Sequence, residues 1–209
     1  MEMKYYSLYA AGLILFVFFI LQSLIGLNLA WQVGSFDIRF FTSMVSHSGM
    51  PHLLGNLFSL LLFGLLLESV VGSMRFLKIL FWAAVVGNLA GIGSYNAVLG
   101  ISGGIYGLIG ALSVLRPKMV IWLSGLPMPM ILVGVAYAFI DLLGAIDPVS
   151  NTGHLAHLAG LVVGLVAGFM YRKQFPDNRS SSRSQRMDKQ TKKAIDKQLD
   201  EYERRYLKE

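Results

Sequence analysis

The sequence predicts an all-α, polytopic membrane protein built as a bundle of six transmembrane helices. Of its 209 residues, 55% are hydrophobic and only 14% are charged, whereas a soluble globular chain carries about 25% charged residues. The apolar residues gather in six runs separated by sparse charges, and about 20 apolar residues suffice for a spanning helix. The chain contains no cysteine, which excludes disulfides and thiolate metal sites.

The first three hydrophobic runs occupy the N-terminal half of the chain. They extend over about 6–31, 52–71 and 75–95, and a loop at 32–51 separates the first two. The first run is longer than the apolar core of a signal peptide, and no small-residue cleavage site follows it. We therefore expect an uncleaved first span.

The last three hydrophobic regions extend over about 102–115, 119–143 and 153–171. Pro127 and Pro129 interrupt the fifth region. Proline removes a backbone donor and clashes with the preceding helical turn. The fifth helix is therefore expected to begin near Met130.

The positive residues predict how the bundle is oriented. With six spans, both termini lie on one side, and only Arg39 of the 18 Lys and Arg residues falls on the other side. On the side of the termini lie Lys4, Arg75, Lys78, Arg116, Lys118 and the basic tail. Cytoplasmic loops carry the excess of Lys and Arg, so we expect cytoplasmic termini in the plasma membrane.

The predicted domain organisation has three parts. Residues 1–175 form the membrane domain, 176–186 a flexible linker, and 187–209 a charged, helical tail with Ile195, Leu199, Tyr202 and Tyr206 on one stripe. That stripe fits a solvated helix, and also docking on a membrane surface or self-association. The tail supplies most of the net charge of +6, so we expect no nucleic-acid partner.

A serine and a histidine on different spans are predicted to lie at one depth. Ser102 precedes Arg116 by 14 residues, and His157 precedes Arg172 by 15 residues. These separations correspond to about 21 and 22 Å along a helix axis, within a hydrocarbon core of about 30 Å. Both side chains are therefore expected below the outer surface at the same level.

Small residues and further polar groups accompany this pair. Glycine stripes let membrane helices approach closely. The stripes are Gly103, Gly107 and Gly110 on the fourth span, and Gly160, Gly164 and Gly168 on the sixth. On the second span, His52 and Asn56 share one helical face. Their position at its outward end suggests donors aimed at a developing oxyanion.

Three motifs carry a resemblance to a known family. They are His-x-x-x-Asn at 52–56, Gly-x-Ser-Gly at 100–103 and Ala-His-Leu-Ala-Gly at 156–160. In this order the chain, over about 39–171, resembles the rhomboid family of intramembrane serine proteases, in its prokaryotic six-span form. The resemblance implies an endopeptidase that cleaves transmembrane segments of single-span proteins near the outer face through an acyl-enzyme.

The same resemblance implies roles for individual residues. Ser102 is the expected nucleophile and His157 the expected general base, in a dyad without an aspartate. The Ser102 backbone N–H, His52 and Asn56 are expected to line the oxyanion hole, and Tyr106 to pack against His157. The supporting glycines are Gly100, Gly103 and Gly160. No cofactor or metal is implied, and the expected partners are membrane-protein substrates and the lipid bilayer.

The main alternative is a catalytically inactive relative that binds membrane helices, and a transporter or channel is a further one. The sequence predicts no oligomeric state.

Several nearby residues compete with these assignments. The motif selects His157 over His154, and His47 is expected to be structural. We expect Asp141 and Asp147 to serve at a helix end or in a loop. Zinc is not expected, because two histidines are too few ligands and no carboxylate or cysteine is matched nearby. In the first loop, Arg39 matches a family arginine, while Ile38 replaces the tryptophan of the family's Trp-Arg pair.

Overall fold

The computed structural model describes residues 5–26, 29–35, 37–92, 94–123, 125–147, 152–177, 191–198 and 201. The chain divides into two compact units, Met1–Phe175 and Pro176–Glu209. The described helices of the first unit are α1 (Tyr6–Ile25), α2 (Arg39–Thr42), η1 (Ser43–Val45), α3 (Met50–Val71), α4 (Ser73–Ala90), α5 (Ser102–Leu115), α6 (Met130–Ala145) and α7 (His154–Tyr171).

Within the described part of the chain, α1, α3, α4 and α7 are long and apolar enough to cross a membrane. Two shorter apolar helices accompany them: α5 has 14 residues and α6 has 16. Together they confirm the predicted six-helix membrane bundle, and the start of α6 at Met130 is confirmed as well.

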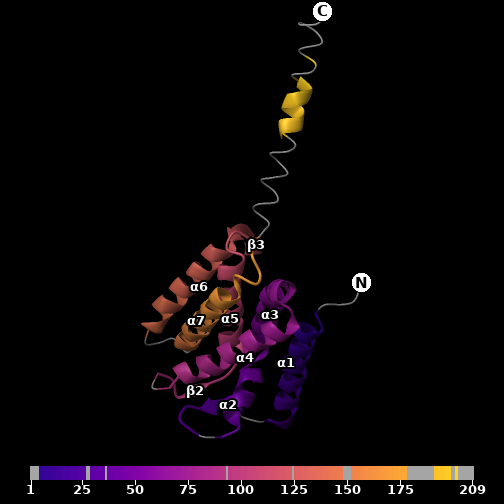
Figure 1. Cartoon of the computed structure of the whole chain (residues 1–209). Coiled ribbons are helices and arrows are strands. Elements are labelled where there is room, and N and C mark those ends of the chain that lie inside the picture. Colours follow the sequence, from indigo (N-terminus) through magenta and orange to yellow (C-terminus); the bar gives the residue numbers. More distant parts are fainter. Residues whose placement is uncertain are drawn as a thin grey trace, which may run out of the picture. The chain divides into compact units, whose positions relative to one another are not determined.

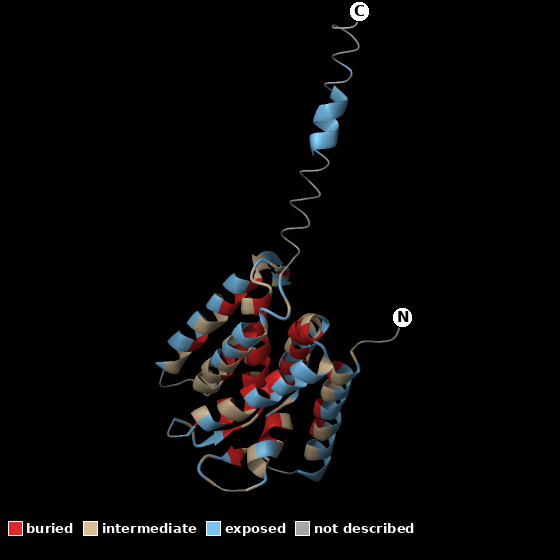
Figure 2. Ribbon diagram, in the orientation of Figure 1, coloured by how far each residue is buried: buried red, intermediate tan, exposed pale blue. Residues whose placement is uncertain are grey.

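Helix α5 forms the centre of the bundle. It contacts α3, α4, α6 and α7 (Figure 1), and Figure 2 shows it largely buried. Of its residues, only Ser102, Tyr106 and Val114 are not fully buried. Two of these three belong to the predicted site, so the central helix exposes little besides that site.

Glycines determine how closely α5 and α7 approach. A β-carbon at Gly160 would overlap the carbonyl oxygen of Gly103, and one at Gly164 would overlap that of Gly107. Since even one methyl group would collide with backbone, the two helices pack main chain against main chain. The expected close approach of the two stripes is confirmed.

The spans end earlier than expected in two places. The first helix ends at Ile25, where Gly26 takes a left-handed conformation with φ of 67°, and the third ends at Ala90. The residues that follow pair instead as β1 (Trp31–Gln32) and β2 (Ala97–Val98). Hydropathy alone placed Trp31 in the first span, whereas Gln32 and both residues of β2 lie outside the predicted spans.

The prolines of the fifth region lie in a hairpin. Strand β3 (Val120–Leu123) pairs antiparallel with β4 (Leu126–Pro129), and Gly125 adopts a φ of 82° in the turn. Pro127 and Pro129 thus stand in a two-stranded sheet, where one partner side is open and their missing N–H groups are tolerated.

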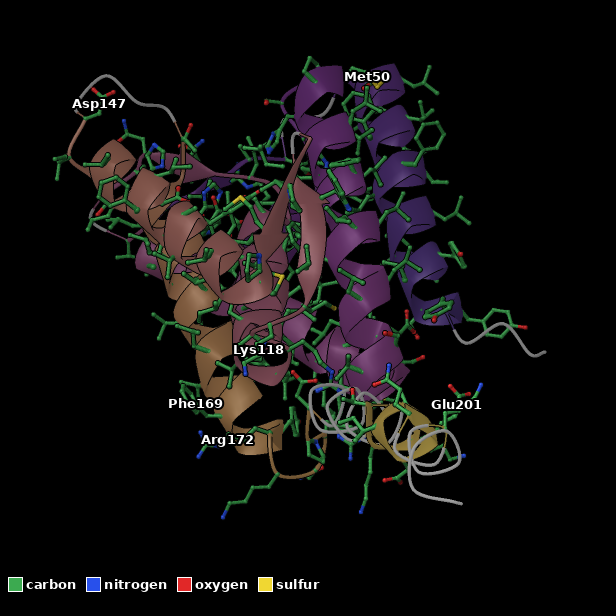
Figure 3. The ribbon with its side chains drawn as sticks, turned by 90° about the horizontal axis from the view of Figure 1, so that it is seen from above. Met50, Lys118, Asp147, Phe169, Arg172 and Glu201 are labelled. Atoms are coloured by element: carbon green, nitrogen blue, oxygen red, sulfur yellow. The ribbon has the colours of Figure 1, made fainter. Side chains whose placement is uncertain are left out.

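The two ends of the bundle differ in charge. Figure 3 shows Met50 and Asp147 at one end, and Lys118 and Arg172 at the opposite end. Also at the latter end, the Arg75 guanidinium lies 5.6 Å from the ring centroid of Tyr171. Positive side chains therefore gather where α4 begins and α7 finishes.

The second unit contains a short exposed helix over residues 191–198. Ile195 is half exposed in it, and Lys197 lies 3.9 Å from Glu201 as an exposed ion pair. The other members of the predicted stripe, Leu199, Tyr202 and Tyr206, lie outside the described residues, as does most of the predicted linker.

The glycine packing yields a prediction about stability. Gly164→Ala should destabilise the protein by about 1–3 kcal/mol, because overpacking forces the α5 and α7 backbones apart. Thermal unfolding in detergent measures the change. Gly12→Ala is the matched control, since a β-carbon there meets only Leu57 at 3.8 Å. Equal unfolding temperatures for Gly164→Ala and Gly12→Ala would contradict the packing argument.

Candidate active site

Ser102 is positioned by a glycine turn that precedes the central helix. Gly100 adopts a φ of 102°, and its N–H donates to the carbonyl of Ser43 at 2.8 Å. Helix α5 then begins at Ser102 itself. The first N–H groups of a helix have no partner within it, so Ser102 presents its hydroxyl beside free backbone donors.

His157 reaches Ser102 from the first turns of α7. Its Nε2 lies 2.8 Å from the Ser102 Oγ. The imidazole stacks on the ring of Tyr106, with centroids 4.3 Å apart and planes inclined by 11°. The structure thus brings together the two residues of the expected dyad and the aromatic ring expected beside them.

Asp141 is the site residue that the sequence analysis missed. Its side chain is buried on α6, and its Oδ1 lies 2.9 Å from the Nδ1 of His157 and 2.6 Å from the Nδ1 of His154. The expected helix-end role of Asp141 is therefore wrong, and so is the expectation that no carboxylate lies near the two histidines. Asp147, in contrast, follows α6 and is exposed.

The three side chains have a composition that suits a metal ion. The potential ligand atoms of Asp141, His154 and His157 all lie within 4.8 Å of one another. Neighbouring ligands of a tetrahedral zinc ion with bonds of about 2.0–2.1 Å stand about 3.3 Å apart. The contacts of 2.6 and 2.9 Å are shorter and have the length of hydrogen bonds, and the absence of a metal here stays a prediction.

His52 and Asn56 approach the serine segment from α3. A β-carbon at Gly100 would lie 2.9 Å from the His52 Nε2 and 3.4 Å from the Asn56 Nδ2. Both side chains therefore converge on the turn before Ser102. The His52 Nδ1 faces the Ser48 Oγ at 3.2 Å, which leaves its Nε2 directed toward the site.

His47 holds Asn56 in place. It is buried in the loop before α3, and its Nε2 lies 2.9 Å from the Asn56 Nδ2. Burial, with a smaller contribution from the nearby His52, lowers the pKa of His47 to about 4. A neutral imidazole accepts a hydrogen bond from the amide, in keeping with a structural role for His47.

Arg39 lies in the first loop, apart from these contacts. Its guanidinium pairs with Asp37 at 2.7 Å and holds the pKa of that carboxyl well below its usual range. Both side chains are partly exposed, and Ile38 between them is 71% exposed. The pair orders the start of α2 and does not contact the site.

A cavity of about 640 Å³ connects the site residues. Its walls include His52, Asn56, Ser102, Gly103, Tyr106 and His157. Other wall residues lie at the start of α3, in the loop before α5 and just before α7. The cavity therefore belongs to the end of the bundle opposite Lys118 and Arg172 (Figure 3).

The conformation of Gly100 leads to a second prediction. Gly100→Ala should lower the reactivity of Ser102 toward a fluorophosphonate probe by at least about 10-fold, because the β-carbon would displace the oxyanion-side donors. Gly34→Ala is the control, since Gly34 also has a positive φ, 90°, but nothing within 4 Å of its β-position. Both variants carry a backbone strain of about 1–3 kcal/mol, so equal reactivity would show that the contact with His52 is unimportant.

Comparison with known proteins agrees with this geometry. A Rhomboid domain model matches residues 37–174. Rhomboid protease GlpG of Haemophilus influenzae is 33% identical over 139 residues, which are 65% of this chain and 70% of that protein. Putative rhomboid protease YdcA of Bacillus subtilis is 34% identical over 63% of this chain and 66% of its own length.

A further relative, Rhomboid-related protein 1 of Caenorhabditis elegans, is 35% identical over 63% of this chain but only 39% of its own length. This chain therefore matches less than half of the length of that relative. The family model matches well over half of the chain and includes every predicted site residue. The chain is therefore a multi-pass membrane protein and belongs to the rhomboid family of intramembrane serine peptidases.

Proposed function

We propose that this protein is an endopeptidase that cleaves the transmembrane segments of single-span membrane proteins near the outer face of the membrane. The observation that carries this proposal is the 2.8 Å contact between the Ser102 Oγ and the His157 Nε2, in the wall of a cavity within an apolar bundle. A serine hydroxyl is a weak nucleophile until a neighbouring base takes its proton.

The proposed reaction proceeds through an acyl-enzyme. The Ser102 Oγ attacks the carbonyl carbon of the scissile peptide while its proton passes to the His157 Nε2. His157 then returns that proton to the leaving amine as the tetrahedral intermediate breaks down. A water molecule, activated by the same imidazole, hydrolyses the ester and regenerates Ser102.

Charge that develops on the carbonyl oxygen needs preorganised donors. The Ser102 N–H at the start of α5 supplies one, and the positive end of the helix dipole adds to it. His52 and Asn56 converge on the same turn and supply the others. In a low-dielectric site such donors act more strongly than they do in water.

The position of the cavity supports the substrate class and the orientation. Loops at the end opposite Lys118 and Arg172 contribute to its wall, and the positive end is the cytoplasmic one by the positive-inside rule. Water then reaches Ser102 from the outer side, and both termini are cytoplasmic in the plasma membrane. Substrates with small or helix-weakening residues are favoured, because a helical peptide bond is shielded by its own hydrogen bonds.

The dyad is tested by removing each of its members. Ser102→Ala and His157→Ala should each lower cleavage of a single-span substrate in liposomes by at least about 1000-fold, and Ser102→Ala should no longer react with a fluorophosphonate. Ser113→Ala is the matched control, because Ser113 lies on the same helix and bonds the carbonyls of Ile109 and Met130. Wild-type cleavage by either dyad variant would refute the proposal. An unreactive Ser102 in the native protein would favour an inactive helix-binding relative.

The oxyanion donors are tested separately. Asn56→Ala should lower kcat by about 100–1000-fold, the usual cost of losing one such donor, with little change in KM. Steady-state kinetics in liposomes measure both constants. An effect confined to KM would instead assign Asn56 to substrate binding.

A further inference from the structure

A buried carboxylate contacts the expected general base, although the mechanism proposed above does not use it. The Asp141 side chain is 2% exposed, and those of His157 and His154 are 12% and 13% exposed. A buried ionised carboxylate is strongly disfavoured unless hydrogen bonds compensate it. Its position between two imidazoles suggests a role in the reaction.

We propose that Asp141 is a positioning residue that completes a Ser102–His157–Asp141 triad, with His154 holding the carboxylate in place. This inference rests on the proposed function, because it assigns Asp141 a task in the same proton transfer. It differs from the two-residue dyad implied by the sequence resemblance.

The contact with Asp141 fixes the tautomer of His157. An ionised carboxylate only accepts hydrogen bonds, so the contact of 2.9 Å requires the His157 Nδ1 to carry the proton and donate it. A neutral imidazole then has an unprotonated Nε2. That is the atom 2.8 Å from the Ser102 Oγ, so the contact with Asp141 selects the tautomer that can act as a base.

The carboxylate of Asp141 also lies beside the positive charge that would appear on His157 during the reaction. When the Ser102 proton moves to the Nε2, His157 becomes an imidazolium held by the Asp141 carboxylate. The Nδ1 proton stays on His157, and the Nε2 proton goes on to the leaving amine, so Asp141 neither gains nor loses a proton. The carboxylate thus stabilises a charge that exists only after proton transfer.

Asp141 also contributes to the orientation of the His157 ring. Three contacts hold the imidazole: its Nε2 to Ser102, its Nδ1 to Asp141, and its face to Tyr106. Each comes from a different direction. A ring held at both nitrogens and one face has little freedom to rotate away from Ser102.

His154 in turn holds the carboxylate. Its Nδ1 lies 2.6 Å from the same Asp141 Oδ1, and a β-carbon at Gly144 would overlap its ring. Gly144 follows Asp141 by three residues, so both lie on one face of α6. Because Gly144 has no side chain, the His154 ring fits beside it and reaches the Asp141 carboxylate.

The decisive variant is Asp141→Asn, which keeps the size of the side chain but removes its charge. Its amide can donate to the Nδ1 and hold the wrong tautomer. We expect kcat to fall by at least about 100-fold, toward the roughly 10⁴-fold loss typical when a triad aspartate becomes asparagine, with KM little changed. A purely structural carboxylate would not produce this separation of kcat from KM.

Two further readouts respond to the hydrogen bond itself. The acidic limb of the kcat/KM profile should move to lower pH in Asp141→Asn, because the imidazolium loses the negative charge beside it. Among the described residues, the other titratable groups facing this site are His52, Tyr95, Tyr106, Tyr137 and His154, and all are retained in the variant. The strongly downfield proton resonance of an imidazole N–H bound to a carboxylate should disappear as well.

Control variants separate this effect from the loss of a buried acid in general. Glu68→Gln neutralises another carboxylate that is 2% exposed, bonded to Ser73 near the far end of α3, and should leave kcat unchanged. Asp141→Glu keeps the charge and should recover part of the activity lost in Asp141→Asn. If Asp141→Asn does not fold, Gly144→Ala provides the test, because it displaces His154 and should lower kcat while Asp141 remains.

The outcomes distinguish this inference from the proposed function. Wild-type kcat and pH profile in Asp141→Asn, with native Ser102 still reactive toward a fluorophosphonate, would overturn the triad and leave the endopeptidase standing. No cleavage and no labelling in the native protein would overturn both. Cleavage that is lost in EDTA and restored by zinc would replace the triad with a metal site, whereas cleavage unaffected by EDTA supports the triad.

Discussion

The structure depends on the main-chain contact between α5 and α7. Gly160 and Gly164 place the backbone of α7 against Gly103 and Gly107 so closely that a single β-carbon would overlap a carbonyl oxygen. In lipid no hydrophobic force draws two apolar helices together, so close van der Waals packing between small residues has to do so. The proposed nucleophile, Ser102, begins one helix of this pair, and the proposed base, His157, lies in the first turns of the other. The same contact that stabilises the bundle therefore sets the distance between the Ser102 Oγ and the His157 Nε2.

The short central helix leaves space for a cavity with polar side chains inside an otherwise apolar bundle. Helix α5 has 14 residues, which correspond to about 21 Å, less than a hydrocarbon core of about 30 Å, so we expect Ser102 at its start to lie below one boundary of that core. The space that a longer helix would have filled belongs to a cavity lined by His52, Asn56 and His157. The donors there are paired with protein groups, as Asn56 is with His47, which keeps the cost of burying them low.

Much of this arrangement was predictable from hydropathy, charge and three motifs. The six apolar helices and the start of α6 at Met130 follow from run length and from Pro127 and Pro129. The ends of α1 and α4 did not follow, because the apolar runs extend to about 31 and 95, whereas these helices end at Ile25 and Ala90. Hydropathy measures the tendency to leave water, and it cannot tell where an apolar run stops being helical.

Asp141 escaped prediction for a different physical reason. Near a helix end a carboxylate points to solvent or to a neighbouring helix, depending on how the whole helix is rotated, and one sequence does not specify that rotation. The structure shows the rotation: Met130, Val133, Gly134 and Asp141 are the buried residues of α6, and their offsets of 3, 4 and 11 from Met130 place them on one face. Helix α6 therefore directs Gly134 and Asp141 toward the neighbouring helices and exposes its leucine and isoleucine side chains to lipid. This rotation places the carboxylate inside the bundle. Because a buried charge is costly unless bonded, the two histidines of α7 are the partners this face requires.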